Sequence, residues 1–168
     1  MCRYIKILKF IIFILILIIS NLGVVYSQTD KGIKDYLYNT LPIKLKKIVP
    51  GTSTDKDLYR IVGVPLKKTD GIFFYKTGHK KYDTTIGVRS GIVEYLIYQY
   101  RPGALFLEDL KKWIPKKQID EAIFRSNKLS HESGRDFEVD LAEHNIKIVV
   151  SRNSQEWVKS VTFFEANK

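Results

Sequence analysis

Two segments of the chain resemble each other at a fixed offset of 65 residues, and this similarity constrains the fold more than any other feature. Residues 45–60 read LKKIVPGTSTDKDLYR, and residues 110–125 read LKKWIPKKQIDEAIFR. The identical pairs are Leu45/Leu110, Lys46/Lys111, Lys47/Lys112, Pro50/Pro115, Asp55/Asp120 and Arg60/Arg125. The same offset matches Val93, Leu96 and Tyr98 with Val158, Val161 and Phe163. Similarity at a constant period is typical of an internal repeat, so the sequence predicts two copies of one structural unit.

Each copy is predicted to begin with a helix. In the first copy Pro50-Gly51 breaks the chain, and a side chain among Thr52, Ser53 and Thr54 caps a helix with Asp55 and Asp57 in its first turn. Gly63 and Pro65 end that helix. In the second copy Pro115 precedes apolar residues at helical spacing, which are Ile119, Ala122 and Ile123, and residues 105–113 are predicted to form an earlier helical turn.

Three strands are predicted after each helix. In the first copy they cover residues 72–76, 82–88 and 92–100, and in the second copy residues 137–141, 146–150 and 157–164. Residues 89–91 and 151–155 supply the turns between the second and third strands. The predicted fold class is therefore α+β, with two tandem copies of a helix plus a three-stranded antiparallel meander after a cleaved N-terminal signal helix.

The first 27 residues have the pattern of a secretory signal peptide. Arg3, Lys6 and Lys9 precede an apolar run over residues 10–19, and Ser27 closes a small-residue cleavage site. The alternative is an uncleaved anchor, because residues 10–26 are near the lower length limit for crossing a bilayer. Cys2 precedes the apolar run, so it does not occupy the place of an acylated lipoprotein cysteine. We therefore expect a secreted or periplasmic protein, in contact with a membrane only if the signal helix is retained.

The expected organisation is a signal peptide (1–27), a short helical segment (28–44) and two repeats (45–103 and 104–168). The only cysteine lies in the signal peptide, so disulfides and thiolate metal ligands are excluded from the rest. Removing residues 1–27 takes away three basic residues and no acidic one, which lowers the formal net charge from +10 to +7. This surplus makes an anionic envelope surface a candidate partner, while export argues against nucleic acid.

The helix that begins in VPGTSTDKDL and closes at Gly63-Val64-Pro65, followed by a meander ending in GIVEYLIY, resembles the small outer-membrane lipoprotein A family, also called SmpA/OmlA or BamE-like. Two such units in tandem look like the architecture of the beta-lactamase inhibitor proteins. The resemblance covers residues 45–100 well and 110–165 poorly. It implies a binding or assembly module without a catalytic centre or cofactor. The chain lacks the acylated cysteine of the lipoproteins and the disulfides of the inhibitors.

The offset also predicts which strand residues face outward. Ile72 and Phe74 match apolar residues of the second copy, which favours a core position, whereas Phe73 and Tyr75 match Glu138 and Asp140. The predicted protein-binding residues on an uncovered sheet face are therefore Phe73, Tyr75, Tyr95 and Ile97. The alternative is that the amino-terminal segment or the other copy covers these side chains and makes them core.

Catalytic patterns are weak in this sequence. His79, His131 and His144 lie in polar loops or turns, and their spacing fits no metal site or catalytic triad. We therefore expect no metal and no cofactor. The expected function is a non-enzymatic exported module that binds a protein partner, and the alternative is a hydrolase-like enzyme that uses Glu138 and Asp140 of the second repeat.

Overall fold

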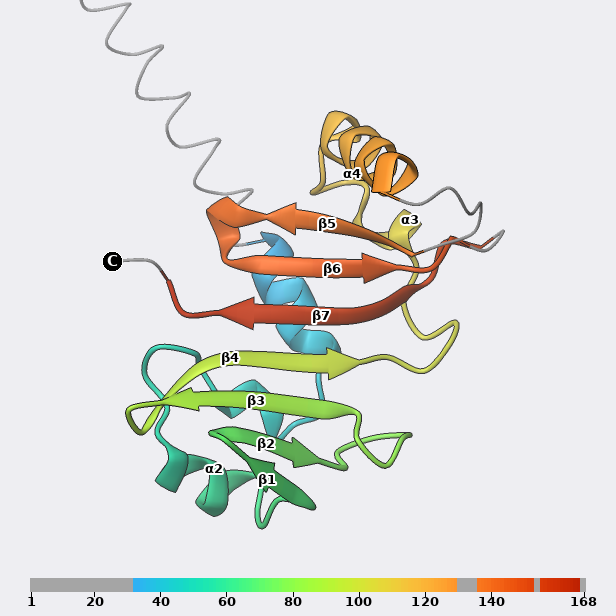
Figure 1. The fold of residues 1–168 in the computed structure, drawn as a ribbon. Coiled ribbons are helices and arrows are strands. Elements are labelled where there is room, and N and C mark those ends of the chain that lie inside the picture. The colour runs from blue at the N-terminus through green and yellow to red at the C-terminus, as the bar shows by residue number, and fades with distance from the viewer. Residues whose placement is uncertain (1–31, 130–135, 153–154, 167–168) are drawn as a thin grey trace, which may run out of the picture.

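The described part of the chain forms one antiparallel sheet of seven strands (Figure 1). The computed structural model describes residues 32–129, 136–152 and 155–166, so the predicted signal peptide lies outside the described residues. The strand order is β1-β2-β3-β4-β7-β6-β5. The strands are β1 (Lys67–Thr69), β2 (Ile72–Tyr75), β3 (Thr84–Arg89), β4 (Ile92–Gln99), β5 (Phe137–Leu141), β6 (Ile146–Val150) and β7 (Val158–Phe164).

The predicted fold class, two tandem units of a helix and three strands, is wrong. β4 and β7 pair directly, with Ile97 opposite Thr162, so all the strands belong to one sheet. The helices of the two halves also differ. The first half has the seven-residue α2 (Asp55–Ile61), and the second has α3 (Leu107–Leu110) and the fourteen-residue α4 (Lys116–Leu129). Gly63 and Pro65 follow α2 closely, whereas no glycine or proline interrupts α4.

The strand positions agree with the sequence prediction to within two residues, except that β1 was missed. β1 and β2 are joined by Asp70 and Gly71, whose φ angles are 47° and 77°. Two positive φ angles are what a tight two-residue hairpin turn requires, and Asp-Gly is a strong sequence signal for such a turn. β1 has only three residues, and two of them are exposed lysines that protect this edge of the sheet from pairing with another chain.

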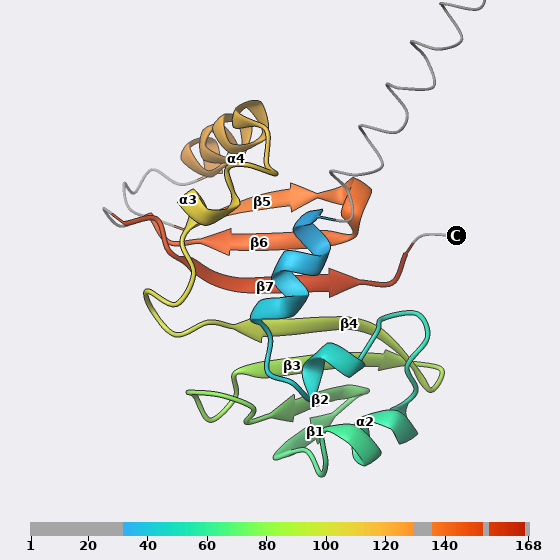
Figure 2. The same cartoon turned by 180° about the vertical axis from the view of Figure 1, so that it is seen from behind.

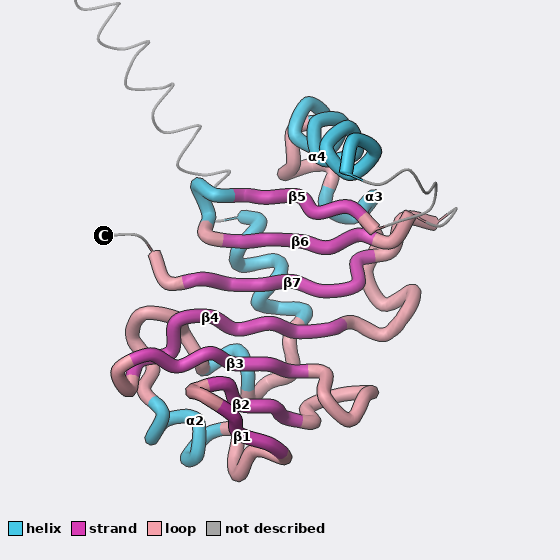
Figure 3. Tube along the Cα trace, viewed as in Figure 1, coloured by secondary structure: helices cyan, strands magenta, loops and turns pink. Residues whose placement is uncertain are grey.

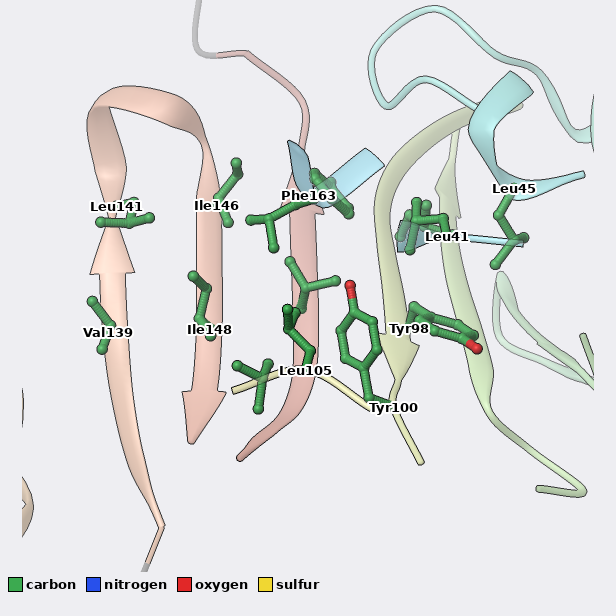
Figure 4. Packing of buried hydrophobic residues seen from close by; sticks show 14 of the residues in the cluster. Leu41, Leu45, Tyr98, Tyr100, Leu105, Val139, Leu141, Ile146, Ile148 and Phe163 are labelled. Atoms are coloured by element: carbon green, nitrogen blue, oxygen red, sulfur yellow. The ribbon is translucent and has the colours of Figure 1, made fainter. Parts of the chain in front are cut away.

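Most of the helices lie over one face of the sheet, which we call the covered face, whereas α4 lies at the edge of the sheet beside β5 (Figure 2). A helix over residues 32–40 crosses behind the strands and buries Ile33 and Leu37 against them (Figure 3). The 3-10 helix η1 (Leu45–Lys47), α2 and α3 add further apolar side chains to the same core. Figure 4 shows Tyr98, Val139, Ile148 and Phe163 among the core side chains that the strands contribute.

The two ends of the sheet are completed by different elements. α4 packs along β5, where it buries Ile119 and Ala122. A short 3-10 helix, η2 (Ala142–His144), joins β5 to β6 and ends at Asn145 with a φ of 55°. At the other end α2 begins with a capping box, in which the Asp57 N–H donates to the Thr54 side chain and the Thr54 N–H donates to the Asp57 carboxylate. The sequence prediction that Thr54 could cap this helix is confirmed.

Candidate functional site

The other face of the sheet carries no helix among the described residues, and we call it the open face (Figure 1). One row of side chains can be followed across all seven strands by their pairing register. The row is Lys67, Phe74, Thr85, Ile97, Thr162, Lys147 and Asp140. A second row contains Ile72, Gly87, Tyr95 and Phe164. A third row contains Gln99, Ser160, Val149 and Glu138.

The structure divides the four predicted binding residues between the two faces. Tyr95 and Ile97 are half-buried on the open face, beside Ile72 and Phe74. The prediction that Phe73 and Tyr75 lie on an uncovered face is wrong. Phe73 is 1% exposed and Tyr75 is 2% exposed, and both belong to the covered core. Burial also raises the pKa of Tyr75 to about 12, and nearby Tyr59 adds to this increase.

The error at β2 arises from the residue offset. The pairing ladder connects Phe73 through Ile86 to Leu96, and it connects Val139 through Ile148 to Val161. Phe73 therefore corresponds to Val139 at an offset of 66, while Leu96 corresponds to Val161 at 65. A shift of one residue moves a side chain to the opposite face of a strand. β2 is apolar at all four positions, so its own sequence does not correct the shift.

Four aromatic side chains lie on and beside the open face as two pairs, and together we call them the aromatic cluster: Phe74 with Tyr82, and Tyr95 with Phe164. Phe74 and Tyr82 meet edge to face, with their ring centroids 5.9 Å apart. Tyr95 lies directly opposite Phe164 in the β4–β7 pair. Cross-strand and edge-to-face aromatic pairs stabilise a sheet and also present rigid apolar area that a partner can cover.

The ring of Tyr95 lies over Gly87 of the neighbouring strand. A Cβ placed on residue 87 would be 2.2 Å from Cε1 of Tyr95, so the ring occupies the space that any side chain there would need. Gly87 is itself buried although it lies on the open face, because the ring covers it. The missing side chain at position 87 therefore allows Tyr95 to lie close against the sheet.

Lysine side chains surround the aromatic cluster. The Nζ atom of Lys67 is 5.8 Å from the centroid of Phe74, that of Lys81 is 5.3 Å from Tyr82, and that of Lys147 is 5.9 Å from Phe164. All three distances fall within the range of cation–π attraction. The apolar centre of the open face is thus flanked by positive charge from β1, β6 and the β2–β3 loop.

The acidic residues proposed for an alternative enzymatic role lie at the β5 end of the open face. Glu138 and Asp140 are both exposed. Lys147 Nζ is 3.2 Å from Oε1 of Glu138, and Lys147 is also paired in register with Asp140. Both carboxylates are exposed to solvent, so the site lacks the enclosed environment that tunes catalytic acids.

Asp83 holds the loop that carries Lys81 and Tyr82. It is fully buried, and its Oδ1 accepts the Thr77 N–H at 2.8 Å while its Oδ2 accepts the Gly78 N–H at 2.7 Å and the Lys80 N–H at 3.2 Å. Burial alone would raise the pKa of Asp83, but these N–H groups and the Thr77 hydroxyl outweigh it and lower the pKa. The sequence analysis missed this residue, although an aspartate a few residues after Thr77-Gly78 is a recognisable turn signal.

The histidines do not assemble a reactive centre among the described residues. His79 is half-buried in the β2–β3 loop, His144 lies in η2, and His131 is outside the described residues. Asp136 forms an ion pair with Lys159. Within the described ranges, no group of three or more His, Cys, Asp or Glu side chains is placed to hold a metal ion. No helix in that same part of the chain is long and apolar enough to span a membrane.

Comparison with known proteins provides little further information. No family model matches the chain, and no curated protein matches it significantly. A structurally similar chain is a DUF4309 family protein (YjgB) from Bacillus subtilis, with 14% sequence identity and a TM-score of 0.46. The alignment covers 82% of this chain and 99% of that chain. At this level of similarity the match supports no conclusion about function.

Proposed function

We propose that the protein is an exported, non-enzymatic binding module that engages a protein partner through the open face. The observation that carries this proposal is the apolar area that β2, β4 and β7 present on that face, where no helix of the described residues covers it. This area comprises Ile72, Phe74, Tyr95, Ile97 and Phe164. Aromatic side chains lose little conformational entropy on binding and dominate many protein interfaces. Export is supported by the signal-peptide pattern of residues 1–27.

The hydrolase-like alternative has less support. A general acid or base needs a pKa matched to its task, which usually requires burial or a closely placed charge. Glu138 and Asp140 are exposed, and Glu138 is already paired with Lys147. A family relationship to the BamE-like proteins would agree with a binding role, but it rests on the sequence motif alone.

The test is affinity capture of the protein from its own cells, using a carboxy-terminal tag and cross-linking before lysis. The binding variant replaces Phe74, Tyr95 and Ile97 with serine. The control variant is Phe124→Ser, which removes an aromatic side chain that is 66% exposed on α4, away from the open face. Melting temperatures and the intact mass of each product establish that the variants are folded and processed alike.

We expect the wild-type protein and the Phe124→Ser variant to capture the same partner, and the triple variant to lose it. Equal capture by all three forms would contradict a role for the open face. Turnover of an ester or glycoside that disappears in a Glu138→Gln variant would instead support the enzymatic alternative.

A further inference from the structure

We infer that the open face is self-complementary and that the partner covering it is a second copy of this chain; this inference rests on the proposed function of that face. The argument starts from the order of side chains in the row that crosses all seven strands. The row begins with Lys67 on β1, has Ile97 on the central strand β4, and ends with Asp140 on β5. Its two ends therefore carry opposite charge.

When a two-fold axis relates two sheets that pack face to face, the axis can run either parallel or perpendicular to the strands. An axis parallel to the strands and passing by β4 exchanges β1 with β5, β2 with β6 and β3 with β7, because β4 is the middle strand of the order. An axis perpendicular to the strands, in the plane of the interface, places each strand over its own copy. A two-fold interface uses the same patch on both molecules, so the patch must complement itself under the chosen rotation.

The axis parallel to the strands pairs the row with itself favourably at every position. Lys67 meets Asp140 of the second copy, which brings opposite charges together. Phe74 meets Lys147 of the second copy, which is a further cation–π pair. Thr85 meets Thr162, and Ile97 meets Ile97 on the axis. The acidic target for Lys67 extends along β5, since Glu138 lies on the same face as Asp140.

The perpendicular axis is disfavoured by charge. It would place Lys67 over Lys67, Lys147 over Lys147 and Asp140 over Asp140, and like charges juxtaposed at an interface cost several kcal/mol by the usual magnitude. Without residues 1–27 the chain still has a formal net charge of +7, so acidic residues are not in surplus to offset the lysine contacts. Charge therefore selects one arrangement, in which the strands of the two sheets run in the same direction.

The size of the face sets the expected strength. Seven strands spaced about 4.8 Å apart span roughly 29 Å, and three side-chain rows about 6.8 Å apart span roughly 14 Å. The interface would therefore bury on the order of 800 Å² from both copies together, which is the size of a weak, transient complex rather than a stable one. We expect a reversible dimer with a dissociation constant in the micromolar range rather than a permanent one.

The test uses charge exchange and the protein purified with a carboxy-terminal tag, in the processed form that the cell produces. Sedimentation velocity over about 5 to 500 µM, a range that brackets micromolar affinity, gives the dissociation constant. The variants are Lys67→Glu, Asp140→Lys and the double variant. Both residues are exposed, so folding should tolerate each change. The matched control is Lys116→Glu on α4, outside the open face.

We expect each single reversal to weaken dimerisation by about tenfold or more, because each dimer contains the Lys67–Asp140 contact twice. The double variant should recover to within about threefold of wild type, since the charge pair is restored with exchanged signs. Lys116→Glu should have no effect. In a Cys2→Ser background, a short bis-maleimide should cross-link Ile97→Cys to its copy on the axis, and should not cross-link Phe124→Cys.

The inference fails if the wild-type protein remains a monomer over this range. It also fails if the double variant is no better than either single variant, or if Ile97→Cys does not cross-link. In those cases the proposed function still holds if the wild-type protein captures a partner other than its own copy and the Phe74, Tyr95 and Ile97 triple variant does not. Both proposals fail when the protein is monomeric and that triple variant captures the same proteins as wild type.

Discussion

Phe73 and Phe74 are adjacent in β2 and chemically identical, but they point to opposite faces of the sheet. Phe73 is 1% exposed and lies in the core, where its ring meets Tyr59 of α2 at a centroid distance of 6.0 Å. Phe74 is half-buried on the open face, against Tyr82 and Lys67. Replacing each with alanine therefore removes the same atoms from two different environments. The pair makes a direct test of the face assignment.

Phe73→Ala should leave a cavity beneath the sheet, and it should lower the free energy of unfolding by about 3–5 kcal/mol, the usual cost of truncating a core phenylalanine. Phe74→Ala should cost about 1 kcal/mol, because part of its ring surface is exposed to water in the folded state. At roughly 2–4 °C per kcal/mol for a chain of this size, the melting temperature should fall by about 6–20 °C for Phe73→Ala and by about 2–4 °C for Phe74→Ala.

Urea unfolding followed by the fluorescence of Trp113 and Trp157 would measure both free energies. Phe73→Leu is the volume control, since it refills most of the cavity and should lose much less stability than Phe73→Ala. A larger loss for Phe74→Ala than for Phe73→Ala would refute the face assignment, and with it the identification of the open face.

The other predictions concern the loop held by Asp83 and the contact between Gly87 and Tyr95. Asp83→Asn should lower the free energy of unfolding by about 2–4 kcal/mol in urea titrations, because both carboxylate oxygens accept backbone N–H groups and either amide orientation would turn its NH₂ group toward at least one of these donors. Because folding lowers the pKa of Asp83, its carboxylate contributes full stability at pH values above the pKa of the unfolded chain, which is near 4. This contribution is lost as the pH falls through the lower pKa of the folded protein. The free energy of unfolding should therefore fall less steeply at acidic pH in Asp83→Asn than in the wild type, and an equal slope would contradict the assignment. Gly87→Ala should cost about 1–3 kcal/mol by overpacking against the ring of Tyr95. A double-mutant cycle should show that most of this cost disappears when Tyr95 is also replaced with alanine, and additive effects would rule out the contact.

Much of the local structure could be predicted from the sequence, because it depends on short-range chemistry. The Thr54 cap of α2 follows from hydrogen bonding within one helical turn. The turn at Ser90 and Gly91, where φ is 51° and 79°, follows from the ease with which glycine adopts a positive φ angle. The alternation of polar and apolar residues in residues 137–141 correctly predicted both the extent and the buried face of β5.

Only two of the four predicted binding residues lie on the open face, and the cause is the long-range pairing of the strands. Tyr95 and Ile97 could be placed on the open face because their strand alternates in a way that agrees with β7. Phe73 and Tyr75 could not, because β2 is apolar at every position and its facing depends on its pairing with β3. Lys81 and Tyr82 reach the aromatic cluster through a loop whose shape depends on the buried Asp83.

The internal similarity at an offset of 65 residues indicated three strands in each half, and the strands are present. The sequence alone did not determine that the halves share one sheet, because the β4–β7 pair joins residues far apart in the chain through backbone hydrogen bonds that any side chain permits. Nor did it determine the faces of β2, since a change of one residue in loop length inverts a whole strand. Short-range chemistry thus determined the elements, and only their long-range pairing decided which aromatic side chains lie exposed on the open face.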